Sequence, residues 1–332
     1  MKTQATITLI LVLLIQGSQI VFAQSCDPVP EFDKKTKAAV IDSIVYSINN
    51  KYVFPEKSQE IIDYLKNRFQ KGAYNHFNSR MMFAQQITAD LRSHTDDLHF
   101  NIAAVRPGAE TGSVCPTGTS SCVPKSNDTD NGFKSVKYLP DKVGYFELTV
   151  FMNTDVGEKT AVKTMETLSD SEALIIDLRN NIGGDLGLVQ FLASYLMEPG
   201  VELITTHRRN SDDTDVFSSL KEIHGKRMTD IPVYILTSHL TASSGEAFAY
   251  ILKHHGRAKI IGEKTVGTAH CAEIDVFQFG DFNLDVRIPT YKPVHPKTGG
   301  NWEDEGVVPD VMVAADEALE YAQKEIRMSM NW

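Results

Sequence analysis

The sequence predicts an α/β fold in which a largely parallel sheet is covered by helices, preceded by a small helical lobe. The first observation is a series of short segments, several of them continuously apolar like strands buried on both faces; they lie at 142–150, 173–178, 201–206, 232–237 and 258–262. The second is that amphipathic segments lie between strands, at 157–169, 185–198 and 243–255. Strands and helices in alternation indicate βαβ units with right-handed crossovers.

Changes in hydrophobic pattern and composition along the chain divide residues 24–332 into three segments. Residues 24–106 predict a helical lobe, because apolar residues recur at helical spacing in three runs separated by Pro55 and by residues 72–78. Residues 107–133 predict an exposed loop, since Gly, Ser, Thr, Pro and Asp cannot bury a core. Residues 134–332 form the α/β domain, which ends in a hairpin around Gly280 and a closing helix at 314–328.

The first 23 residues predict an export signal. Lys2 supplies the positive start, residues 7–15 are apolar, and Ala23 is a small residue suited to the cleavage site. A secreted or periplasmic protein is therefore expected, and acylation of Cys26 is the alternative. Pairing is the default for cysteines after export, and Cys115 and Cys122 flank a loop, so we predict a disulfide between them.

Composition narrows the classes of partner. The net charge of −10 disfavours a nucleic-acid partner, because phosphate binding needs a basic face. Hydrophobic content of 42% and charged content of 23% are ordinary for a globular protein, and nothing indicates peripheral membrane contact. No metal is expected, since no cysteine pair has the close C-x-x-C spacing of a zinc site.

A turn of small residues follows the apolar strand at 232–237. It reads TASSGE over residues 241–246 and leads into the helix at 243–255. Ser243 would stand at the helix N-terminus, where the dipole favours negative charge, and the N–H of Ser244 could donate to an oxyanion. The structural alternative is a capping box, in which Ser243 and Glu246 satisfy backbone N–H groups.

A second turn carries a glycine pair. The string DLRNNIGG at 177–184 takes a buried strand into a helix through Gly183 and Gly184. Tandem glycines allow close approach of a ligand and can direct N–H groups at it. The structural alternative is a tight βα turn, with Asp177 and Arg179 as a bracing ion pair.

Together these motifs, and IIGEKTVG at 260–267, resemble the tail-specific (C-terminal-processing) proteases, the S41 peptidases. The resemblance implies a ClpP/crotonase-like core, a nucleophile at Ser243, and an oxyanion site formed by Gly183 or Gly184 with Ser244. The processing-protease branch has a lysine base where this chain has Thr268, and Lys264 is out of register. The resemblance therefore does not imply a Ser–Lys dyad.

The tricorn-core and interphotoreceptor retinoid-binding-protein branch is more similar. It resembles this chain in DDLH at 96–99, GTAH at 267–270 and WEDEGVVPD at 302–310. The resemblance implies His99 as the general base and Glu303 as the distal carboxylate, with His270 in a structural role. Leu98 stands where the tricorn-type site has a serine.

The expected reaction is hydrolysis of a peptide or protein substrate through an acyl-enzyme on Ser243, with no metal or organic cofactor. A non-catalytic protein on the same fold is the competing class. It would bind retinoids, fatty acids or peptides, and a deep apolar cavity without an aligned catalytic set would favour it.

Overall fold

A computed structural model describes residues 32–108, 130–209 and 212–330. The predicted export signal and the predicted Cys115–Cys122 disulfide lie outside the described residues. In the described part of the chain, no helix is both long and apolar enough to span a bilayer.

The three predicted N-terminal helices are confirmed, as α1 (Lys34–Lys51), α2 (Pro55–Gln70) and α3 (Arg80–Thr95). The Asp33 side chain caps α1 by accepting from the N–H of Thr36, and Ser79 caps α3 in the same way. Pro55 is the first residue of α2, where a missing N–H costs nothing.

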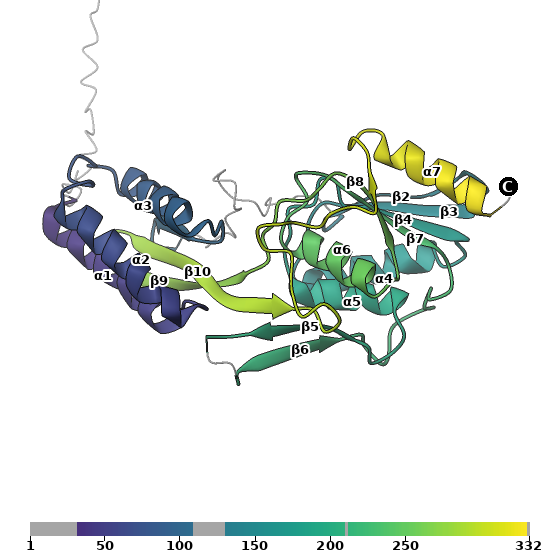
Figure 1. Ribbon diagram of the computed structural model, residues 1–332, viewed down its shortest axis with the longest axis horizontal. Coiled ribbons are helices and arrows are strands. Elements are labelled where there is room, and N and C mark those ends of the chain that lie inside the picture. The colour runs from purple at the N-terminus through teal and green to yellow at the C-terminus, as the bar shows by residue number, and fades with distance from the viewer. Residues whose placement is uncertain (1–31, 109–129, 210–211, 331–332) are drawn as a thin grey trace, which may run out of the picture. The chain divides into compact units, whose positions relative to one another are not determined.

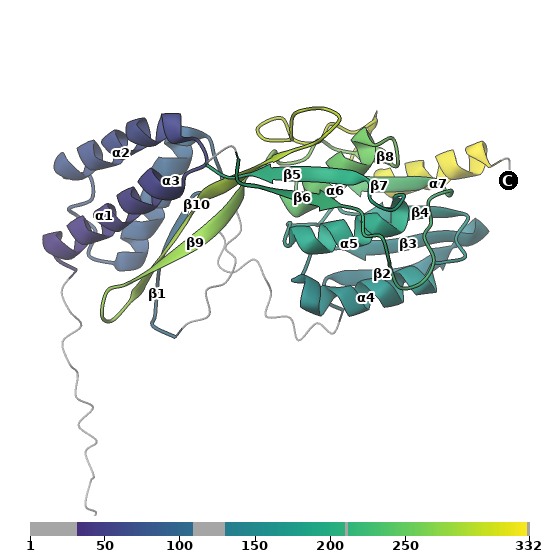
Figure 2. The same ribbon diagram turned by 90° about the horizontal axis from the view of Figure 1, so that it is seen from below.

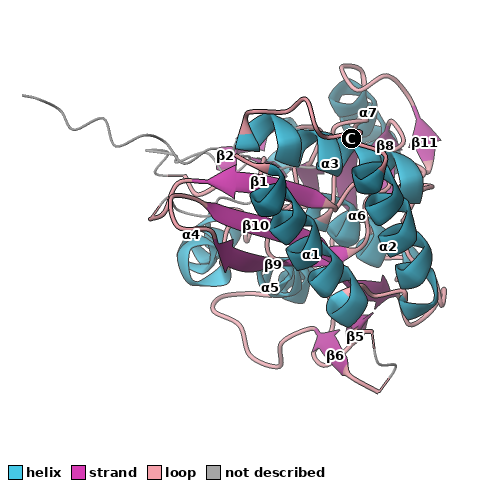
Figure 3. Ribbon diagram, turned by 90° about the vertical axis from the view of Figure 1, so that its left-hand side faces the viewer, coloured by secondary structure: helices cyan, strands magenta, loops and turns pink. Residues whose placement is uncertain are grey.

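Three strands of a five-stranded sheet pack against these helices and include residues distant in sequence. They are β1 (Asn101–Val105), β9 (Cys271–Gln278) and β10 (Asn283–Val294), and β10 pairs antiparallel with both others. Figure 3 shows these strands side by side behind α1. The predicted hairpin is thus confirmed, and its apolar side chains complete the core of the helical lobe; they are Phe282, Leu284, Val286 and Ile288.

The main sheet has six strands in the order β11-β8-β7-β4-β3-β2, and all neighbours are parallel except β2 and β3. The strands are β2 (Phe133–Leu139), β3 (Val143–Leu148), β4 (Ala173–Asp177), β7 (Val233–Thr237), β8 (Lys259–Gly262) and β11 (Val311–Met312). A short 3-10 turn, Pro140–Lys142, joins β2 to β3. The predicted α/β class is confirmed.

Helices cover both faces of this sheet, as Figure 1 shows. One face packs against α4 (Thr154–Thr167), α5 (Leu186–Leu196) and α6 (Ser244–His254). The other packs against α7 (Ala318–Ser329). The alternate side chains of β4 divide between the two cores, Ile176 on the first face and Ile175 on the second, as the pleat of a strand requires.

Residues 201–206 form a strand as predicted, but it does not belong to the parallel sheet. This strand, β5 (Glu202–His207), pairs antiparallel with β6 (Thr214–Ser218) and with the end of β10 (Figure 2). The physical reason is its polarity: the sequence ELITTH has exposed and half-buried positions, whereas β4 and β7 are buried throughout.

Candidate active site

Ser243 lies at the sharp turn between β7 and α6 and has an unusual backbone conformation. Its φ and ψ are 51° and −116°, in a region that non-glycine residues rarely adopt and that differs from the extended backbone usual at a helix N-cap. The Ser243 N–H donates to Glu246 Oε2 at 2.8 Å, as in a capping box. Ser243 therefore begins the helix, and it does so with backbone strain that capping alone does not require.

The glycine loop lies directly against this serine. A Cβ placed on Gly183 would be 2.7 Å from the Ser243 Cβ, and one on Gly184 would be 1.9 Å from the Phe151 carbonyl oxygen. Both glycines have positive φ, 98° and 134°. Only glycine fits at either position, because a side chain would meet its neighbours and strain the backbone.

The N–H groups of the predicted oxyanion residues differ in availability. The Gly183 N–H donates to Asn181 Oδ1 at 2.9 Å. Among the described residues, the N–H groups of Gly184 and Ser244 have no hydrogen-bond acceptor. The Ser244 hydroxyl donates to the Gly184 carbonyl at 2.7 Å and so ties these two residues together. Gly184 and Ser244 are thus the pair available to an oxyanion.

Glu246 organises the turn from beneath. It is fully buried, and its carboxylate accepts from three backbone N–H groups and two hydroxyls, those of Ser243, Gly267, Thr268 and Thr265. Burial raises the pKa of Glu246, and these hydrogen bonds offset only part of the rise. Thr268, at the position of the lysine base in the processing branch, is held by Glu246, while Lys264 is exposed.

His99 has Asp97 as its nearest carboxylate. His99 Nδ1 lies 3.1 Å from Asp97 Oδ1, which also accepts from the His99 backbone N–H at 2.9 Å. His99 is 7% exposed, and its Nε2 is buried with no hydrogen-bond partner among the described residues. A buried imidazole whose Nδ1 faces a carboxylate and whose Nε2 is unengaged has the arrangement that a general base needs.

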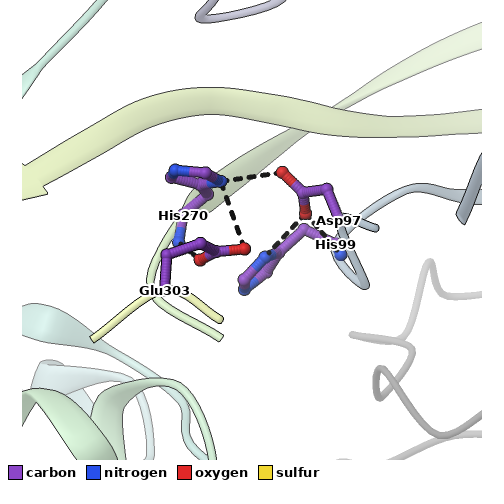
Figure 4. A group of neighbouring side chains, drawn as sticks. All are labelled: Asp97, His99, His270 and Glu303. Atoms are coloured by element: carbon purple, nitrogen blue, oxygen red, sulfur yellow. Dashed lines mark hydrogen bonds and ion pairs between the residues drawn. The ribbon is translucent and has the colours of Figure 1, made fainter. Parts of the chain in front are cut away.

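Glu303 lies in the same cluster, but its contacts are with His270 (Figure 4). Its Oε1 is 3.4 Å from His270 Nδ1, and its Oε2 accepts from the backbone N–H groups of Ala269 and His270. His270 Nδ1 also lies 2.7 Å from Asp97 Oδ2. Asp97 thus joins the two imidazoles, and among the described residues Glu303 is linked to His99 through His270 and Asp97.

Burial and pairing compete in setting the charges of this cluster. Burial raises the pKa of Asp97, but hydrogen bonds from His270 and His99 lower it further, so it lies well below the usual range. Burial lowers the pKa of His270, and Asp97 more than reverses the effect, so the net shift is upward. Burial raises the pKa of Glu303, which the charge of His270 only partly offsets.

Residues 268–270 connect the serine turn to the histidine cluster. Thr268 Oγ1 accepts from the Ser243 N–H at 3.1 Å, and the next two N–H groups donate to Glu303. In the described part of the chain, no hydrogen bond joins the Ser243 hydroxyl to either imidazole. A pocket of about 290 Å³ opens beside the cluster, and Asp97, His270, Glu303 and Lys292 help to line it.

Sequence reasoning assigned no role to two residues that organise the site. Asp97 was recognised only as part of a motif. Its second partner in the site, His270, is 173 positions away in the sequence, so their contact could not be predicted. Asn181 is fully buried, and it ties the glycine loop to the serine turn by accepting the Ala242 N–H at its carbonyl and the Gly183 N–H at its side chain. The position of Asn181 two residues before the first glycine of the pair was the available signal.

The chain resembles known proteins across both of its parts. Residues 142–313 match peptidase family S41, and residues 27–136 match the N-terminal domain of peptidase S41 in eukaryotic IRBP. The chain is 33% identical over 130 residues to the carboxyl-terminal-processing protease of Picosynechococcus sp., covering 38% of this chain and 29% of that protein. It is 33% identical over 127 residues to carboxyl-terminal-processing peptidase 3, chloroplastic, of Arabidopsis thaliana, covering 38% and 24%. The chain thus spans less than a third of the length of these relatives.

A solved structure shares the fold over most of the chain. The lipoprotein from Streptococcus agalactiae superimposes with a TM-score of 0.61 at 15% identity, covering 88% of this chain and 96% of that one. At this identity the likeness establishes the fold alone. The match to the family model establishes family membership as well as fold, because it covers more than half of the chain and includes the glycine loop, the serine turn and Glu303. The protein belongs to peptidase family S41.

Proposed function

We propose that this protein is a serine-type peptidase with Ser243 as its nucleophile. The observation that carries the proposal is the strained turn of Ser243 beside two N–H groups, those of Gly184 and Ser244, that have no acceptor in the described structure. Strain of this kind is typical of a nucleophile at a strand-to-helix turn, and paired N–H donors stabilise the oxyanion of acyl transfer.

In the proposed reaction, His99 Nε2 takes the proton of the Ser243 hydroxyl as Oγ bonds to the peptide carbonyl carbon. The carbonyl oxygen becomes an oxyanion between the Gly184 and Ser244 amides. Collapse breaks the C–N bond, and the leaving amine takes the proton from His99. Water then repeats the sequence and releases the acid.

Asp97 is the carboxylate at His99 Nδ1, so it would keep the proton of the neutral imidazole on Nδ1, leave Nε2 unprotonated, and stabilise the imidazolium when it forms. Glu303 would have no direct contact with His99 and would act on His270. The missing Ser243–His99 hydrogen bond is compatible with this scheme, because catalytic hydrogen bonds often tighten only when substrate binds.

Peptides or proteins are the proposed substrates, and export from the cell, suggested by residues 1–23, is the proposed setting. The competing function, retinoid or fatty-acid binding, gains no support from the pocket beside the cluster. Its lining includes Asp97, Glu303, Lys57 and Lys292, which do not suit an apolar ligand.

A fluorophosphonate probe, which reacts with activated serines, tests the proposal. Wild-type protein should be labelled, and Ser243→Ala should lose both labelling and peptide cleavage. Ser244→Ala is the matched control: it keeps the backbone N–H but loses one hydrogen bond to Gly184, so labelling should slow no more than about 10-fold. Wild-type protein that folds but is never labelled would refute the proposal.

A further inference from the structure

Four side chains that commonly bind metals converge in the histidine cluster. Asp97, His99, His270 and Glu303 each offer one ligand atom, and these atoms all lie within 4.8 Å of one another. In Figure 4 the donor atoms face a common centre. The four residues come from three separate places in the chain, residues 97–99, His270 and Glu303, so no short sequence motif indicates the site. We propose that this cluster binds one Zn²⁺ ion.

The donor chemistry suits zinc. Two imidazole nitrogens and two carboxylate oxygens form a set that Zn²⁺ accepts in tetrahedral geometry, with bonds of about 2.0–2.2 Å. Such a tetrahedron has edges of roughly 3.4 Å. The separations from His270 Nδ1 are 2.7 Å to Asp97 Oδ2 and 3.4 Å to Glu303 Oε1, and His99 Nδ1 is 3.1 Å from the other Asp97 oxygen, Oδ1. All four ligand atoms lie within 4.8 Å of one another, so the side chains have to close in around the ion, and the two carboxylates balance its charge.

The supporting contacts already orient the ligands. Glu303 Oε2 is fixed by the N–H groups of Ala269 and His270, which leaves Oε1 directed at the centre. Asp97 Oδ1 accepts the His99 N–H, and Oδ2 faces His270. Hydrogen bonds to the side chains that bind a metal fix their orientation and strengthen metal binding.

The adjoining pocket supplies an entry path. Asp97, His270 and Glu303 line both the pocket and the cluster. Lys57 and Lys292 also line it and oppose a cation, whereas Asp96 and Asp304 attract one. With Asp97 and Glu303 included, the carboxylates that line the pocket outnumber the ammonium groups.

Zinc at this site would block the proposed reaction, a consequence that rests on the proposed function. A neutral imidazole has one proton, so Zn²⁺ bound at His99 Nδ1 requires the tautomer in which that proton is on Nε2. Nε2 then cannot accept the proton of Ser243. The site would thus act as a reversible inhibitory site for a divalent cation.

Zinc binding is measured by titrating the metal-free protein with Zn²⁺ in competition with a chromophoric chelator. Wild-type protein and Ser243→Ala should each bind one ion with the same affinity. Asp97→Asn and His270→Gln should each weaken binding at least ~10-fold. The control is His239→Gln, which removes an exposed histidine 2.7 Å from Glu263 and should leave the affinity unchanged.

Absence of saturable binding by the wild type at micromolar Zn²⁺ would overturn the proposal, as would equal affinity in both ligand variants. Thermal unfolding checks that each variant is folded. If Asp97→Asn does not fold, the comparison of His270→Gln with wild type decides the question. Because Ser243→Ala is part of the series, zinc binding is measured whether or not Ser243 is a nucleophile. Fluorophosphonate labelling of the wild type should fall with zinc and return with EDTA; binding without this loss refutes the inhibitory role.

Discussion

Replacing the buried carboxylate of Glu246 tests how the serine turn is held. In wild-type protein Oε1 accepts from the Thr265 hydroxyl and the Gly267 N–H, both at 2.6 Å, and Oε2 accepts from Ser243 and twice from Thr268. Glutamine offers one oxygen in place of two. In either orientation its amide N–H groups face at least two donors, which are then unpaired.

The expected cost follows from that count. Each buried donor left without an acceptor costs about 1–3 kcal/mol, so Glu246→Gln should lower the free energy of unfolding by about 2–6 kcal/mol. Urea unfolding at neutral pH measures it, as a lower midpoint at an unchanged slope. Glu202→Gln is the control, because the exposed carboxylate of Glu202 accepts, among the described residues, only from the Thr205 hydroxyl; this change should alter stability by no more than ~0.5 kcal/mol. A Glu246→Gln midpoint equal to that of wild type would refute the reasoning.

Three further predictions follow from single features. Gly184→Ala should lower the free energy of unfolding by at least ~3 kcal/mol, because the new Cβ would meet Phe151 and the residue has a positive φ. Gly200→Ala should lower it by about 1–2 kcal/mol, because Gly200 has φ 77° but open space around it. Urea unfolding of both variants separates the packing contribution from the backbone strain. His99→Ala should slow peptide hydrolysis at least ~10²-fold and Lys264→Ala should leave it within a few-fold; the reverse order would indicate a lysine base. Burial, with His255, His254 and Lys297, lowers the pKa of His295 to about 4, so stability should fall as pH drops from ~6.5, where unfolded histidine protonates, towards 4. Thermal unfolding should show a weaker pH dependence in His295→Phe, and an unchanged dependence would contradict this assignment.

The parts of the fold set by local pattern were predictable. The lobe helices follow from helical periodicity, and β4 and β7 follow from continuous apolar runs, because in each case the residues of the element itself indicate which faces are buried. The sheet to which β5 belongs was not predictable, since strand pairing depends on a distant partner: Thr205, Thr206 and His207 of β5 pair with Val294, Pro293 and Lys292 of β10. The ion pair of Asp177 and Arg179, named as part of the structural alternative for the glycine turn, is present, with 2.6 Å between Oδ2 and Nη2.

The candidate site divides in the same way. That the glycine pair lies near Ser243 was implied by the resemblance to the S41 peptidases, and in the structure Gly183 does contact Ser243. The preference for Gly184 over Gly183 was beyond reach, because it depends on where the Asn181 side chain points. The neighbour of His99 was likewise unpredictable: both Asp97 and Glu303 are carboxylates, and only the path of the chain decides which faces Nδ1. The roles of Ser243, His99 and Glu303 stay predictions.

The crossing of the β9–β10 hairpin into the helical lobe has a consequence for the order of assembly. The chain emerges from synthesis in sequence, and the lobe core is incomplete until residues up to Ile288 have been made. His270 and Glu303 lie just before and just after this excursion. The segment that carries Ser243 is therefore complete well before the histidine cluster can close. A nascent or truncated chain would carry Ser243 and His99 but lack His270 and Glu303, so the cluster around Asp97 would stay incomplete until these later residues are in place.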